Sequence, residues 1–132
     1  MNQRPLSPHL GIYKLGYTML LSGLHRITGC VATVGLLLFV WWLMALASGP
    51  AAYANAMKIL ASPLGRFVLF GFAFSFIYHF CNGIRHMNWD TGRGLERAEA
   101  RRSGVVVVVA VVLLTALVIW LGCTAMTNTG AP

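Results

Sequence analysis

Charged side chains are scarce in this sequence, and acidic ones are the scarcest. Only 10% of the residues are charged, with three Asp and Glu against ten Lys and Arg, whereas a soluble domain carries about 25%. Hydrophobic residues make up 58% of the chain, and the mean hydropathy is +0.71. This composition excludes an ordinary soluble domain and predicts a membrane protein. The net charge of +7 would suit nucleic acid, but the basic residues lie between apolar runs, so we expect no nucleic acid partner.

Cysteine is also scarce and never paired. Cys30, Cys81 and Cys123 are each isolated within apolar sequence. The chain has no C-x-x-C-H motif, which excludes covalent haem attachment, and no paired spacing typical of a zinc site or a disulfide. We therefore interpret these thiols as small buried hydrophobes.

The amino-terminal residues 1–14 lack the apolar core of a secretory signal. Pro5 and Pro8 disfavour a helix and predict an extended arm on the membrane surface. A transit peptide would have no room before the first apolar run. We therefore expect direct insertion into a bacterial inner membrane rather than import into an organelle.

Three apolar stretches are long enough to cross a bilayer as helices, which takes about 20 residues. We predict membrane spans at residues 16–47, 64–87 and 105–126, within one all-α membrane domain that covers residues 1–132. The valines at 105–109 favour a strand by propensity. However, an open strand cannot satisfy its backbone in lipid, so the length of the apolar run decides for a helix.

Two segments join these spans. Residues 48–63 are expected to form a short connecting loop, and residues 91–103 form a charged segment that must lie in water. We find no internal repeat.

Lys and Arg gather on one side of the predicted membrane. Eight of the ten lie near the amino terminus or around the segment between the second and third spans, and only Lys58 and Arg66 lie on the opposite side. The positive-inside rule then places the amino terminus in the cytoplasm and the carboxyl terminus outside. The same topology places residues from two helices at one cytoplasmic depth: Ser22, His25, Arg26, Arg85, His86 and Asp90.

His79 is the first candidate functional residue, because it is the only ionisable group between Arg66 and Arg85 in an apolar run. Polar groups within a membrane are costly and mark functional sites. Seven residues return a helix to within about 20° of the same face, so His79 and His86 point the same way. A flat macrocycle bound at His79 could lie along this face with its propionates near Arg85 and His86. Alternatively, the two histidines form hydrogen bonds between helices.

Ser22 and Arg26 form the second candidate pair, one helical turn apart on one face. Together with His25 they offer donors suited to a carbonyl oxygen that gains negative charge. Alternatively, Arg26 only anchors the helix by reaching the lipid phosphates.

Three motifs follow one another along the chain. They are Arg4-Pro5-Leu6-Ser7-Pro8-His9-Leu10 with Ile12-Tyr13-Lys14, then Ser22-x-x-His25-Arg26-x-x-Gly29, then His79-x-x-x-Gly83-Ile84-Arg85-His86 with Asp90. In this order, and with three spans between and around them, they resemble the cytochrome b556 membrane-anchor subunits of succinate dehydrogenase over nearly the whole chain. Gly16 departs from the pattern, since many relatives carry proline there.

The resemblance implies a role for each candidate residue. His79 matches the axial ligand of haem b, and the second axial histidine comes from another membrane-anchor subunit. This agrees with our expectation that no second histidine of this chain lies at the depth of His79. His25, Arg26 and His86 match positions near the haem propionates, and Ser22 with Arg26 matches the ubiquinone pocket. The implied partners are the second anchor subunit, the iron–sulfur subunit, the flavoprotein that oxidises succinate, and the lipid bilayer.

Asp90 is the only acidic residue near the expected quinone pocket. Quinone reduction consumes two electrons and two protons, so a carboxylate near water could relay protons. An ion pair with Arg85 at the helix end is the simpler interpretation.

Two other functions stay open at this point. A related anchor of a fumarate reductase would work with menaquinol in the opposite direction, and the residues do not fix the direction. A haem-free anchor would only dock the soluble subunits. A transporter is disfavoured, because the chain has three spans and no repeat.

Overall fold

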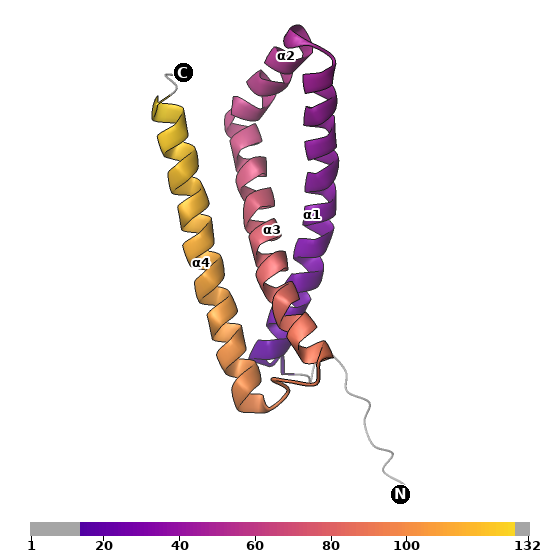
Figure 1. Ribbon diagram of the computed structural model, residues 1–132, viewed down its shortest axis with the longest axis vertical. Coiled ribbons are helices and arrows are strands. Elements are labelled where there is room, and N and C mark those ends of the chain that lie inside the picture. The colour runs from indigo at the N-terminus through magenta and orange to yellow at the C-terminus, as the bar shows by residue number, and fades with distance from the viewer. Residues whose placement is uncertain (1–13, 129–132) are drawn as a thin grey trace, which may run out of the picture.

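The computed structural model describes residues 14–128, apart from the side chains of residues 126–128, and the described chain is entirely helical between its turns. Its helices are α1 (Tyr17–Ala47), α2 (Pro50–Ala61), α3 (Pro63–Asp90) and α4 (Arg97–Asn128) (Figure 1). The predicted amino-terminal arm and its motif through Tyr13, and the end of the carboxyl-terminal tail, lie outside the described residues.

Three of the helices are long and apolar enough to cross a membrane: α1, α3 and the Arg97–Ala125 part of α4. Each coincides with one of the predicted spans to within a residue or extends beyond it, and α1 begins directly after Gly16. Most of their large apolar side chains are exposed, as expected where lipid or another subunit covers the helix. The prediction of an all-α membrane anchor with three spanning helices is confirmed.

The prediction of a loop at residues 48–63 was wrong, because most of this segment forms α2. Gly49 turns the chain with a positive φ of 105°, a conformation that glycine adopts at little cost. Pro50 then occupies the start of α2, where its missing N–H has no partner to lose. The alanines that follow are strong helix formers. Gly-Pro therefore starts a helix here rather than a loop.

The charged segment 91–103 is also partly helical, since α4 begins at Arg97. The turn before it contains Gly92 and Gly94, both with positive φ, and the indole N–H of Trp89 donates to the Gly94 carbonyl at 2.8 Å. The first two turns of α4 therefore lie beside the end of α3.

Helix α3 lies between α1 and α4 (Figure 1). The three helices meet in a small core of Leu21, Tyr78, Val107 and Val111. Gly104 allows α4 to approach α1 there, because a Cβ at this position would lie 2.8 Å from side-chain carbons of both Tyr17 and Leu21. Towards α2, α1 and α3 diverge (Figure 1).

The thiols do not follow the expected burial. Cys30 and Cys123 are exposed, and only Cys81 is partly buried. The prediction of buried thiols was wrong for those two within the described chain.

The start of α1, the end of α3 and the start of α4 lie at one end of the molecule, and α2 lies at the other (Figure 1). Lys58 of α2 and Arg66 of α3 are thus separated from the other described basic residues. This arrangement agrees with the charge pattern behind the predicted orientation, and the side that faces the cytoplasm stays a prediction.

Candidate functional site

Histidines from α1 and α3 meet in a cluster of His25, His79 and His86. The ring of His25 stacks on that of His79, with centroids 4.0 Å apart and planes 4° from parallel. The His86 ring lies 4.9 Å from His25 at a 36° tilt. His79 and His86 therefore face the same residue of α1, as their seven-residue spacing predicts. The expectation that no other histidine lies at the depth of His79 was wrong, because the packing of α1 on α3 places His25 against it.

The His79 ring is oriented by the backbone of α1. Its Nδ1 lies 3.0 Å from the carbonyl oxygen of His25. A carbonyl oxygen can only accept, so Nδ1 carries the proton and donates. The Nε2 atom then keeps its lone pair, which is the arrangement found in metal-binding histidines whose other nitrogen donates to a backbone carbonyl.

Gly29 makes this close approach possible. A Cβ on Gly29 would lie 2.9 Å from Cε1 and 3.2 Å from Nδ1 of His79, which is closer than side-chain atoms normally come. In the sequence, Gly29 belongs to the motif of Ser22 and Arg26, and its contact with His79 was not predicted. Gly29 lies one turn after His25 on α1. A glycine at this spacing could have indicated that a side chain of another helix packs there.

Two buried nitrogen atoms of the cluster have no hydrogen-bond partner within the described chain: Nδ1 of His25 and Nε2 of His86. Buried polar groups nearly always have a partner, so these atoms indicate a further group in this region. Carboxylates such as the propionates of a haem would accept hydrogen bonds from such nitrogens. With the free Nε2 of His79, the donor set fits haem b.

His25 is not oriented to bind a metal together with Nε2 of His79, despite the contact between the two rings. A metal lies in the plane of a ligating imidazole, about 2 Å from the nitrogen. His25 instead presents its ring face to His79.

Arg85 is buried against the start of α4. It is 4% exposed and donates to Ser103 Oγ at 3.1 Å, to the Ala100 carbonyl at 2.9 Å and to Asn82 Oδ1 at 3.3 Å. Its guanidinium carbon also lies 4.0 Å from the centre of the Trp89 ring. The structure thus joins Arg85 to α4, and its expected place near the haem propionates stays a prediction.

Three residues that were not predicted as site residues support the histidine cluster: Trp89, Tyr78 and Asn82. Trp89 packs edge-on against His86 with centroids 5.1 Å apart. The Tyr78 hydroxyl and the Asn82 amide donate to the Leu21 carbonyl at 2.8 and 3.3 Å. These bonds fix α3 against α1 one turn before His25. Only their polarity within an apolar run could have indicated such a role.

The candidate quinone residues lie at the same end. Ser22 is half-buried and Arg26 is exposed, and neither side chain has a hydrogen-bond partner among residues 14–128. Asp90 is exposed at the end of α3 and forms no ion pair with another described residue. The simpler interpretation of Asp90 is thus not seen within this part of the chain, because Arg85 is engaged with α4.

The fold and these motifs agree with comparisons to known proteins. A family model described as succinate dehydrogenase/fumarate reductase transmembrane subunit matches residues 1–118. The chain belongs to this family. The succinate dehydrogenase cytochrome b556 subunit of Paracoccus denitrificans is 39% identical over 114 residues, which cover 86% of this chain and 88% of that protein. The corresponding subunit of Rickettsia prowazekii is 42% identical over 117 residues, or 88% of this chain and 90% of that protein.

A mitochondrial relative also matches. The succinate dehydrogenase cytochrome b560 subunit of Homo sapiens is 39% identical over 114 residues, which cover 85% of this chain and 68% of that protein. All three relatives are subunits of succinate dehydrogenase. They favour this function over a fumarate reductase anchor and confirm the family resemblance seen in the sequence.

Proposed function

We propose that this chain is the haem b-containing membrane-anchor subunit of a succinate dehydrogenase in a bacterial inner membrane. It helps pass electrons from succinate, through the iron–sulfur subunit, to ubiquinone, and it is not catalytic alone. The observation that carries the proposal is the orientation of His79, whose Nδ1 is bound to the His25 carbonyl and whose Nε2 is left free. The relatives named as cytochrome b subunits support it.

His79 would hold the haem iron through Nε2, and the second anchor subunit would supply a second histidine. When bound, the haem would supply a one-electron carrier, which is the chemistry that electron transfer to a quinone needs. Within this chain, Gly29 provides the space for the His79 ring. His25 and His86 would donate to the propionates through the nitrogens that have no partner in the chain.

Ser22 and Arg26 would bind ubiquinone. The Ser22 hydroxyl can donate to one quinone oxygen, and the Arg26 guanidinium, which stays cationic, can stabilise the negative charge that develops on reduction. Both lie at the end of the molecule that is predicted to face the cytoplasm, where the iron–sulfur subunit docks. Asp90 at the exposed end of α3 is placed to exchange protons with water, which is its proposed role.

Purification of the intact complex tests this function. We expect this chain to co-purify with a second anchor, an iron–sulfur and a flavoprotein subunit, and succinate to reduce a low-spin haem with a sharp alpha band. The complex should catalyse the reduction of ubiquinone by succinate faster than it catalyses the reduction of fumarate by menaquinol. A complete complex without a haem spectrum would instead identify a haem-free anchor.

A further inference from the structure

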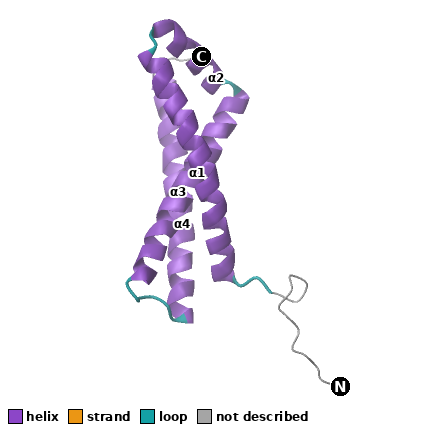
Figure 2. Ribbon diagram, turned by 90° about the vertical axis from the view of Figure 1, so that its right-hand side faces the viewer, coloured by secondary structure: helices purple, strands orange, loops and turns teal. Residues whose placement is uncertain are grey.

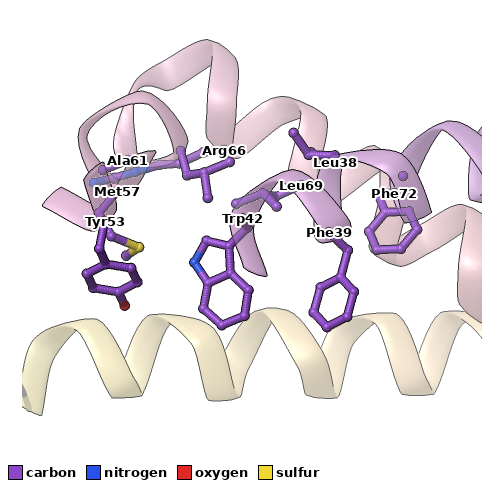
Figure 3. A pocket seen from close by; sticks show the side chains of 11 residues that line it. Leu38, Phe39, Trp42, Tyr53, Met57, Ala61, Arg66, Leu69 and Phe72 are labelled. Atoms are coloured by element: carbon purple, nitrogen blue, oxygen red, sulfur yellow. The ribbon is translucent and has the colours of Figure 1, made fainter. Parts of the chain in front are cut away.

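A cavity lies between α1, α2 and α3, at the end opposite the histidines. Its volume is about 510 Å³, within the range of about 300–1,000 Å³ that ligand pockets occupy. Most of its lining is apolar or aromatic, including Leu38, Phe39, Trp42, Leu69 and Phe72 (Figure 3). The cavity is open on one side, so a long molecule can enter from the surrounding membrane.

The cavity is built into the fold by a fixed corner between α2 and α3. Ser62 caps α3 by accepting a hydrogen bond from the Gly65 N–H at 3.1 Å. Gly65 packs so tightly on the backbone of Leu60 that a Cβ would collide with it. At the inner end, the Phe72 ring lies directly over Gly35 of α1 and separates the cavity from the rest of the α1–α3 contact.

Arg66 is the one charged residue in the lining. It lies in the first turn of α3, where the positive end of the helix dipole favours an anion. No hydrogen bond or ion pair joins its guanidinium to another of residues 14–128. Tyr53 and Trp42, which also line the cavity, are residues typical of the membrane–water interface.

We propose that this cavity binds an anionic phospholipid, with an acyl chain among the apolar side chains and the phosphate on Arg66. Charge complementarity favours this occupant. An apolar helix of a partner subunit would leave the Arg66 guanidinium without an anionic partner. A neutral quinone ring would not pair with the positive charge of Arg66 either. Arginine is well suited to phosphate because it donates two parallel hydrogen bonds. The inference does not depend on the haem or quinone assignments.

Lipid titration of the purified complex, followed by native mass spectrometry, tests the proposal. The complex in detergent is titrated with phosphatidylglycerol and, separately, with phosphatidylcholine. We expect one phosphatidylglycerol to bind in preference, and Arg66→Gln to weaken it at least about tenfold, the effect of losing a charged hydrogen bond. Lys58→Gln is the matched control, since Lys58 is a cation at the same end but does not line the cavity.

A second variant keeps the test decisive if Arg66→Gln does not assemble. Leu69→Trp fills the cavity and leaves Arg66 in place, so it should reduce phosphatidylglycerol binding without changing the charge. Unchanged binding in both variants would overturn the proposal. It would also be overturned if the molecule lost from the Arg66→Gln complex were a quinone, or if a photoreactive residue at position 69 cross-linked to a protein subunit instead of lipid.

Discussion

At the residue scale, the site depends on how an imidazole fits against the backbone of the neighbouring helix. The His79 ring contacts Gly29 and donates to the His25 carbonyl, so its position is set by α1 as well as by α3. Such supporting contacts typically change metal affinity by about 10–100-fold when they are removed. The proposed haem ligand of α3, His79, should therefore be sensitive to small changes on α1.

We predict that Gly29→Ala lowers haem content several-fold while His79 is still present. The new methyl group would stand 2.9 Å from the His79 ring and force it to move. The measurement is the ratio of haem to protein in the purified complex. Gly23→Ala on the same helix is the control, because a Cβ there meets nothing within 4 Å. Equal loss of haem in both variants would show that the substitutions act by altering α1 in general and not through the contact with His79.

We also predict a selective loss of quinone reduction when Ser22 or Arg26 is changed. Ser22→Ala removes one hydrogen bond of about 1 kcal/mol, or roughly fivefold in rate. Arg26→Leu removes the charge that stabilises the developing anion, so we expect a loss on the order of a hundredfold or more.

The measurement compares ubiquinone-dependent activity with succinate oxidation by an artificial acceptor in the same preparation. The second activity uses only the soluble subunits and should persist in both variants. A parallel fall in both activities would mean that Ser22 and Arg26 serve assembly instead.

At the element scale, α3 is held by polar contacts on two sides. Tyr78 and Asn82 bind the backbone of α1, and Arg85 binds Ser103 and the backbone of α4. Arg85 is buried with neutral partners and the Trp89 ring. These contacts cluster near the histidines, so the bundle is tightest where the cofactor is proposed to bind.

Gly104 provides a test of this packing. Gly104→Val would push Tyr17 and Leu21 away from α4, and overpacking of this kind costs about 1–3 kcal/mol. We expect a lower thermal unfolding temperature of the complex. Gly122→Val lies on the same helix with open space around it and should have a much smaller effect. If the two variants unfold alike, the α1–α4 contact does not contribute to stability.

The sequence predicted the three spanning helices because lipid selects long apolar runs, and it predicted the shared face of His79 and His86 because helical spacing is regular. It did not predict α2, since Gly49 and Pro50 can end one helix or begin the next. It also did not predict that Arg85 faces α4 or that His25 stacks on His79. Helical spacing says which residues share a face, but only packing says which helix that face meets.

At the scale of the whole molecule, the two ends of the helical bundle differ in their number of basic residues. The basic residues at the start of α1, the end of α3 and the start of α4 lie at the end opposite α2 (Figure 2). The candidate quinone residues lie at the basic end, and the proposed lipid cavity lies at the other. The predicted orientation would put quinone reduction near the cytoplasm and the lipid in the outer leaflet.

Reporter fusions test this orientation. A reporter fused after Pro132 should be active only on the outer side of the membrane, because eight of ten Lys and Arg lie on the other side. A fusion within residues 91–96, between α3 and α4, should report the cytoplasm. A cytoplasmic signal after Pro132 would contradict the three-span topology.

The most direct test of the central claim is the redox spectrum of the complex carrying His79→Ala, compared with that of His86→Ala. Our account predicts that His79→Ala removes the low-spin haem spectrum or converts it to a form with an open or substituted iron position. His86→Ala should keep a bis-imidazole spectrum, because His86 is proposed to contact a propionate and not the iron. An unchanged bis-imidazole spectrum in the His79→Ala complex would contradict the assignment of His79 as the haem ligand.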